Sequence, residues 1–211
     1  MTLAVIVSVN AGLPQGSPSG PGRSAIHKHP LAGLVRAGRL GLEGDGQADI
    51  RHHGGPDRAL HAHFLQHLRA WGQERGCPLD PGAIGENLTL AAAPDGPASD
   101  EAALCIGDVL RAGTAVLQVS QPRIPCHKQA ARIGVPVARI AQSGRCGLYL
   151  RVLEEGVVGS GAVLELLERP HPDVTVADAH RFVHGIREPA LQARLAACPE
   201  LGPDLVRRLR V

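Results

Sequence analysis

The sequence predicts a mainly β fold of the α+β class, a barrel or sandwich followed by three short helices. Several short apolar segments, separated by turn residues, occupy the chain up to residue 168, and this pattern is typical of barrels and sandwiches. Only one strong helical pattern lies in the same region. Three short helical patterns fill residues 169–211.

The first expected strand covers residues 3–9, an apolar run that ends at Asn10. It lacks a basic leader and is too short for a signal peptide. No stretch approaches the ~20 apolar residues of a membrane span. We therefore expect a soluble, cytoplasmic protein with no membrane partner. Residues 13–23, rich in Pro, Gly and Ser, are expected to form a loop.

The strongest helical pattern in the first half covers residues 57 to about 73. Gly55 is expected as the N-cap of this helix, with Pro56 in its first turn. Apolar residues then recur at the helical spacing i, i+4, i+8 and i+11, which predicts one buried stripe: Leu60, Phe64, Leu68 and Trp71.

Further short strands are expected after residue 84. Residues 88–90 form one of them. A tight hairpin at Ala112-Gly113 is expected to join two more, and Glu155-Gly156 to link another two. These four strands cover residues 103–111, 114–120, 147–153 and 162–167.

Two prolines within three residues, Pro170 and Pro172, predict a linker between residues 1–168 and residues 169–211. Beyond it, Thr175 begins a capping-box variant that opens a helix to about residue 184. Two further helices are expected over residues 188–197 and 203–210. Because three short helices form only a small core, we expect them to pack on the β region.

Composition argues against several classes of protein. A net charge of +2 does not favour sequence-independent nucleic-acid binding, so no nucleic-acid polymer is expected as a partner. The chain has five cysteines and no CxxC spacing, which argues against a secreted disulfide framework or a zinc ribbon. Lys28 and Lys128 are its two lysines, a scarcity that we attribute to codon bias.

Cys126, in the segment VSQPRIPCHKQ, is the residue best suited to chemistry. The proline before it has no N–H, which places the cysteine at or just past the end of a strand. The neighbours Arg123, His127 and Lys128 are expected to lower the pKa of its thiol. A thiolate attacks electrophiles and binds soft metals. The alternative is a buried structural thiol, which fits Cys105 better.

The segment HHGGPDRA, residues 52–59, is a second candidate. If a helix starts here, its positive end, which accepts phosphate or an oxyanion, carries the backbone N–H groups of Gly54, Gly55, Asp57 and Arg58. The side chains of His53 and Arg58 are expected to add direct contacts. A plain glycine turn that starts a helix is the alternative.

The segment GEN, residues 85–87, is a third candidate. Glu86 and Asn87 together offer the donors and acceptors that recognise a heterocycle. They equally suit a loop that caps its own backbone.

His63 and His67 stand at i, i+4 on the predicted helix, a spacing that suits zinc. No acidic residue lies between them in the zinc-protease pattern, and one of them falls in the apolar stripe. We therefore prefer ordinary surface or core histidines to a zinc hydrolase.

Five motifs occur in a recognisable order: GLEGDGQAD, HHGGPDRAL, GENL, CIGDVLRAG and VSQPRIPCHK. Together they resemble the MOSC domain family, named after the C-terminal domain of molybdenum cofactor sulfurase. The match extends to its hydroxylaminopurine-resistance, YiiM-like branch. The segment HPDVTVADAHRFVHG is similar to the three-helix extension of that branch. The resemblance implies a MOSC-type β-barrel over residues 1–168 and this extension over residues 169–211.

The resemblance also implies a bound molybdenum cofactor (molybdopterin), with Cys126 as the metal ligand or as a sulfur carrier. It implies a molybdenum-dependent oxidoreductase that reduces N-hydroxylated compounds such as hydroxylaminopurine bases. On this expectation His53 or His127 donates a proton. The cofactor is held by Asp45, Gly54, Gly55, Arg58, Glu86, Asn87, Gln121, Arg123 and Lys128.

The expected partners are a small N-hydroxylated substrate and a separate electron-donor reductase, because no flavin or iron–sulfur motif occurs in this chain. A homodimer is left open. Two other functions also stay open. One is a sulfur carrier that uses a Cys126 persulfide, and the other is a non-catalytic module that binds or delivers the cofactor.

Overall fold

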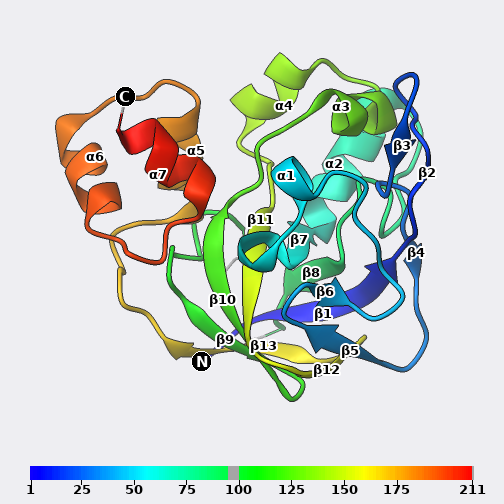
Figure 1. Cartoon of the computed structure of the whole chain (residues 1–211), viewed down its shortest axis with the longest axis horizontal. Helices are drawn as coiled ribbons and strands as arrows, with labels where there is room; N and C mark the ends of the chain where they lie inside the picture. Colours follow the sequence, from blue (N-terminus) through cyan, green and yellow to red (C-terminus); the bar gives the residue numbers. More distant parts are fainter. Residues whose placement is uncertain (95–99, 211) are drawn as a thin grey trace.

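The structure is a computed structural model that describes residues 1–94 and 100–210. Val211, the last residue of the expected extension, lies outside the described residues. The main feature is a closed barrel of seven strands in the order β13-β9-β10-β11-β7-β8-β1, and β13 pairs with β1 to close it (Figure 1). Its strands are β1 (Thr2–Ala11), β7 (Leu60–Phe64), β8 (Leu88–Ala92), β9 (Val109–Ala112), β10 (Ala115–Pro122), β11 (Leu148–Glu154) and β13 (Val163–Glu168). The predicted α+β barrel is confirmed.

All neighbouring barrel strands are antiparallel except β7 and β8, which are parallel and joined by α2 (Leu65–Arg75). Such a parallel pair needs a crossover connection, and α2 supplies it. Among the short strands, β4 (His29–Pro30) pairs with β1. Two small separate sheets are formed by β2 (Gln15–Gly16) with β3 (Arg23–Ser24), and by β12 (Gly156–Gly159), β5 (Leu34–Gly38) and β6 (Gly41–Leu42). The remaining helices are α1 (Ile50–His53), the 3₁₀ turn η1 (Pro56–Arg58), α3 (His127–Ile133), α4 (Val137–Ser143), α5 (Val176–Val183), α6 (Pro189–Ala196) and α7 (Pro203–Leu209).

The prediction of one helix over residues 57 to about 73 is wrong. The chain forms η1, then the barrel strand β7, and only then α2. A spacing of four fits both structures, because Leu60 and Phe64 share one face of a strand as well as one face of a helix. Residues 60–64 form a strand because they pair with β8 and β11, and all five residues of this strand are buried. His61 and His63 consequently point to the opposite face.

The expected strands elsewhere are confirmed with shifted bounds. The hairpin at Ala112-Gly113 joins β9 to β10. The expected strand 103–111 begins only at Val109, because Cys105 makes a single bridge to Thr175 of the extension. The link through residues 155–156 is not a simple turn, since β12 intervenes and pairs with β5. Helices α3 and α4, which follow Cys126, were not predicted.

The three C-terminal helices pack on the barrel, as expected. Thr175 and Asp178 form the predicted capping box, with the Thr175 Oγ1 accepting from the Asp178 N–H at 3.0 Å. Val176, Phe182 and Leu205 belong to the same buried apolar cluster as the barrel interior. Figure 1 shows α5, α6 and α7 together on one side of the barrel, beside β10.

A second apolar cluster lies beneath α2, α3 and α4 and includes Leu68, Trp71, Ile84, Ile133 and Ile140. It holds α3, and so Cys126, against the barrel. None of the described helices has the length and apolar character needed to cross a bilayer.

Candidate active site

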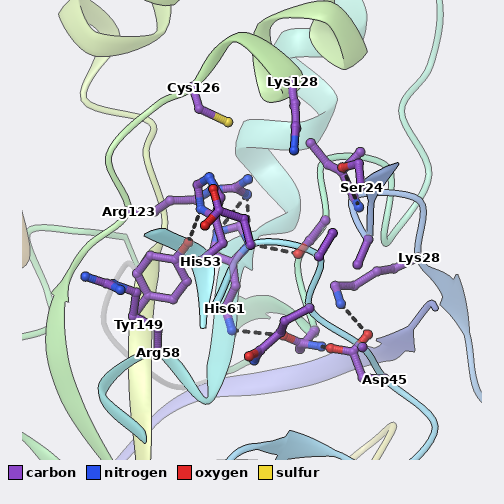
Figure 2. A pocket seen from close by; sticks show the side chains of 18 residues that line it. Ser24, Lys28, Asp45, His53, Arg58, His61, Arg123, Cys126, Lys128 and Tyr149 are labelled. Carbon is purple, nitrogen blue, oxygen red and sulfur yellow. Dashed lines mark hydrogen bonds and ion pairs between the residues drawn. The ribbon is translucent and has the colours of Figure 1, made fainter. Parts of the chain in front are cut away.

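Cys126 lies where two cavities meet. The first cavity lies at the mouth of the barrel and is lined from α1, β7, β11, α3 and the loops before them. The second, a cleft of about 680 Å³ that opens to solvent, lies between the barrel and the C-terminal helices. Cys126, His53 and Tyr149 line both. In Figure 2 the Cys126 sulfur and the Lys128 ammonium point from α3 into the first cavity.

The backbone explains the position of Cys126. Strand β10 ends at Pro122, and α3 begins at His127 with Cys126 as its N-cap residue. The thiol thus lies just past a strand end, as predicted, and faces the N–H groups of the first turn of α3. Such N–H groups favour a negative charge.

The electrostatic surroundings favour the thiolate of Cys126. Burial by itself raises the pKa of this thiol, but a hydrogen bond with His53, the positive charge of Arg123 and the backbone N–H of Gln129 outweigh it and lower the pKa to about 6. Cys126 is therefore largely ionised at neutral pH. A thiolate is the form that binds metals and attacks electrophiles.

Tyr149 holds the imidazole that contacts the thiol. Its hydroxyl lies 3.1 Å from Nδ1 of His53. Burial raises the pKa of Tyr149, so the hydroxyl is protonated at neutral pH and is able to donate to Nδ1. A neutral imidazole that accepts at Nδ1 carries its hydrogen on Nε2. His53 is thereby set up as a hydrogen-bond donor toward Cys126.

Arg123 places a buried positive charge beside the thiol. The residue is 5% exposed, and its Nη1 donates to the Ile84 carbonyl at 2.8 Å and to Nδ1 of His61 at 3.0 Å. Burial, then the charge of Arg123, keep the pKa of His61 well below its ordinary value, so the ring is neutral, and its Nδ1 also lies 3.2 Å from the Gly85 carbonyl oxygen. No carboxylate pairs with Arg123 among the described residues. A buried cation without an anion is costly, and the Cys126 thiolate is the anion beside Arg123.

The far end of the first cavity is organised by Asp45. The carboxylate pairs with Lys28 and accepts from the Gly12 N–H at 2.9 Å and from Nδ2 of Asn87 at 2.8 Å. Asn87 also accepts the His61 N–H at 3.1 Å. Figure 2 shows the Lys28–Asp45 pair at the side of the cavity away from Cys126. These polar groups are fixed before any ligand binds.

The structure brings most of the predicted site residues together. Seven of them line the first cavity: Asp45, His53, Arg58, Asn87, Arg123, Cys126 and Lys128. His127 is exposed and lines the second cavity instead, beside Cys126.

Four predicted residues line neither cavity. Glu86 is fully buried and accepts hydrogen bonds from Gly82, Ile84 and Thr89, so it holds its own loop. Gln121 donates to Asp204 of α7 at 3.2 Å. Gly54 lets the chain approach Gln47 closely, because a Cβ there would lie 2.2 Å from the Gln47 Oε1. Gly55, with φ of 86°, precedes a single 3₁₀ turn rather than a long helix. Their positions support structural roles, and the anion-accepting helix start is absent.

The residues that line the first cavity without having been predicted include Lys28, His61 and Tyr149. A signal existed for Lys28, because both lysines of this arginine-rich chain line the same cavity. Tyr149 is the one tyrosine of the chain. His61 was hidden by the helix prediction, since only a strand turns it toward the cavity.

The described residues contain no group of three or more potential metal ligands among His, Cys, Asp and Glu. His63 is fully buried, and burial keeps its pKa well below the ordinary value. Its ring centroid lies 5.8 Å from that of His67, whose Nδ1 faces Glu101 at 3.4 Å. This arrangement supports core histidines rather than a zinc site.

The chain resembles known sequences and a solved structure along most of its length. It is 43% identical to the uncharacterized protein YflK of Bacillus subtilis over 181 residues, which cover 84% of this chain and 79% of YflK. A protein of Gibberella moniliformis named a reductase is 37% identical over 206 residues. These cover 93% of this chain but 35% of the fungal protein, so the chain spans about a third of that relative.

The crystal structure of YiiM from Geobacillus stearothermophilus superposes with a TM-score of 0.81 at 33% sequence identity, covering 98% of this chain and 97% of that one. The resemblance to the YiiM-like branch, inferred from five motifs, is therefore confirmed. Residues 49–165 match the MOSC domain model. They include β7, β11, α3 and Cys126 itself, and so most of the first cavity. The chain belongs to the MOSC domain family.

Proposed function

We propose that this protein binds a molybdenum cofactor in the first cavity, with Cys126 as metal ligand, and reduces N-hydroxylated compounds. One observation carries the proposal: the Cys126 thiol, with a pKa of about 6, lies at the edge of a cavity lined by cationic side chains. A soft thiolate suits such a metal. Membership of a family named after molybdenum cofactor sulfurase supports the same interpretation.

The residues present fit the cofactor, which combines a pterin, a dithiolene and a phosphate. The cationic groups of Arg123 and Lys128 have no carboxylate partner among the described residues and suit the phosphate. Lys128 does donate to the Arg23 carbonyl at 3.2 Å. At the other end, Asp45 and Asn87 offer acceptors and donors to a heterocycle. Arg58 lines the cavity but is already paired with Asp204 at 2.7 Å.

The reaction consumes two electrons and two protons: the N–O bond of R–NH–OH breaks, and R–NH₂ and water form. The cofactor supplies the two-electron chemistry when bound. His53 is positioned by Tyr149 to donate a proton to the departing oxygen. His127, exposed on the second cavity, is a second donor candidate. The described wall of the first cavity leaves Cys126 accessible from the second cavity, where a substrate would enter.

The electrons must come from a partner, for which we propose a separate reductase. The chain spans about a third of the fungal relative named a reductase. The remaining length of that relative offers room for an electron-donating part.

The test is reduction of an N-hydroxylated purine by protein loaded with molybdenum cofactor, with a chemical electron donor. Cys126→Ser should lose turnover and retained molybdenum together, because a hydroxyl is a poor soft-metal ligand. Cys77→Ser, an exposed thiol outside both cavities, is the matched control and should keep both. Full activity in Cys126→Ser would end the proposal.

A sulfur carrier relies on the same thiolate, so the assay must separate the two functions. Intact-mass measurement of the freshly purified protein, with elemental analysis, does so. One additional, reductant-labile sulfur on Cys126 together with no molybdenum and no turnover would favour the carrier. Stable cofactor binding without turnover under any donor would favour a delivery module.

A further inference from the structure

Residues of both the barrel and the C-terminal extension line the second cavity. The barrel side contributes Cys126, His53 and Tyr149. The extension contributes four residues, Arg187, Asp204, Arg207 and Arg208. If the cofactor fills the first cavity, Cys126 remains reachable only from this second side. A substrate would therefore meet the extension before it meets the thiol.

On the extension side of the cavity, the one carboxylate has several partners, whereas two of the three arginines have no carboxylate partner among the described residues. Asp204 accepts from Arg58 at 2.7 Å and from Gln121 at 3.2 Å, and it also pairs with Arg207. Its negative charge is thus fully engaged. Arg187 and Arg208 have no carboxylate partner among the described residues.

Arg187 is also held in place. Its guanidinium lies 4.2 Å from the centre of the Phe182 ring and donates to the Phe182 carbonyl. A guanidinium carries five N–H donors in a rigid fork that matches phosphate geometry. The remaining donors of Arg187 are thus available at the wall of the cavity, and Arg208 adds a second unpaired cation.

The other acidic residue on the second cavity does not cancel these cations. Asp49 on the barrel side is engaged by His52, whose Nδ1 lies 2.9 Å from Oδ2. The thiolate of Cys126 is compensated by Arg123 and His53. The extension wall therefore presents net positive charge to whatever enters.

We propose that Arg187 and Arg208 bind the phosphate of the substrate, so that the preferred substrate class is the phosphorylated form of an N-hydroxylated base, a nucleotide, rather than the free base. This inference rests on the proposed reductase function and specifies its substrate. A cleft of about 680 Å³ is large enough for a nucleotide. The base reaches toward Cys126 while the phosphate stays at the extension wall.

Binding is measured first, because it needs neither cofactor nor turnover. Isothermal titration with the 5′-monophosphate of an N-hydroxylated purine nucleoside, and with the unphosphorylated nucleoside, compares the two forms. We expect the monophosphate to bind about tenfold more tightly, with an affinity that falls as salt rises. The double variant Arg187→Gln/Arg208→Gln should lose most of this preference.

The matched control is Arg36→Gln/Arg111→Gln, which removes the same charge from exposed residues that do not line the second cavity. It should bind both probes like the wild type. Equal binding of the two probes, or an unchanged preference in the cavity variant, would overturn the inference. Reduction of the unphosphorylated substrate by the loaded wild type would then still support the proposed function.

Two further measurements test whether Arg187 and Arg208 bind something other than the substrate phosphate. If the cavity variant loses molybdenum on purification, the arginines bind the phosphate of the cofactor and the inference is wrong. If the variant binds nucleotide normally but requires more electron-donor protein for half-maximal rate, they dock that partner, and the inference is again wrong. Phosphate-selective binding in the wild type without any reduction would instead refute the reductase function and leave the subsite standing.

Discussion

The Nδ1 atom of His53 lies 3.1 Å from the Tyr149 hydroxyl, and the same imidazole hydrogen-bonds the Cys126 thiol. Tyr149 on β11 thus influences the ionisation of Cys126, at the start of α3, through His53 on α1. The three residues form a short chain from a buried hydroxyl to the junction of the two cavities. Its consequences can be measured on the purified protein.

Removing the Tyr149 hydroxyl should raise the pKa of Cys126. In Tyr149→Phe the His53 ring loses the donor that orients it, so its hydrogen bond to the thiol weakens. We expect the midpoint of pH-dependent alkylation of Cys126 to move upward by about one pH unit, which corresponds to ~1.4 kcal/mol. The phenyl ring preserves packing, so unfolding in urea should change little. An unmoved midpoint would show that Tyr149 does not act through His53.

Cys126 should be the one buried-site thiol that reacts at neutral pH. Burial raises the pKa of Cys105 and of Cys198 to about 11 and that of Cys146 well above its ordinary value. In a Cys77→Ser background, which removes the exposed thiol, iodoacetamide at pH 7 should modify Cys126. Below about pH 6 the rate should fall tenfold per pH unit as the thiolate disappears. Peptide mass spectrometry locates the label, and comparable labelling of Cys105 would contradict the prediction.

The buried His63 should make the fold sensitive to mild acid. Burial lowers the pKa of its ring, so the unfolded chain binds this proton more readily than the folded chain. Stability should therefore fall as the pH drops through the ordinary histidine value of about 6.5, with a slope of up to ~1.4 kcal/mol per pH unit for this group.

His63→Leu should remove that contribution and flatten the pH dependence of the free energy of unfolding in urea. Neither ring nitrogen of His63 has a partner among the described residues, so no hydrogen bond is lost. His29→Leu, a change at an exposed histidine, should keep the wild-type slope. Identical slopes in all three proteins would rule out a role for His63.

Asp204 should be important for attachment of the extension to the barrel. Asp204→Asn leaves the buried Arg58 guanidinium, whose side chain is 4% exposed, without its anion. We expect a loss of about 3 kcal/mol in the free energy of unfolding. Asp173→Asn is the control, because its contact with Arg194 at 3.7 Å is exposed and should contribute less than about 0.5 kcal/mol. Similar losses in both variants would mean that Asp204 is an ordinary surface residue.

Local patterns predicted the elements that local interactions form. The hairpin at Ala112-Gly113 and the capping box of Thr175 are examples, because each depends on neighbours a few residues away. Strand β7 was taken for a helix because Leu60 and Phe64 satisfy both periodicities. Its strand form depends on pairing with β8 and β11, which no window of sequence contains.

In the site, too, some features depend on neighbours in the sequence and others on contacts between distant segments. Arg123 and Lys128 stand within three residues of Cys126, so their influence on the thiol was visible in the sequence. For Glu86 the sequence left two roles open, recognition of a heterocycle or capping of its own loop, and the fold buries it in the second role. Which polar side chains turn toward a cavity is decided by packing on both sides of the loop.

The sequence by itself determined the family, the barrel class, the position of Cys126 past a strand end and the cationic neighbours that favour its thiolate. Closure of the barrel decided the rest. It brings Tyr149 next to His53 across a separation of 96 residues, and both lysines into one cavity. It also places the extension so that Arg187 and Arg208 line the same cavity as the thiol. Such contacts join distant segments, and they form only when burial of the shared apolar core fixes those segments in one arrangement.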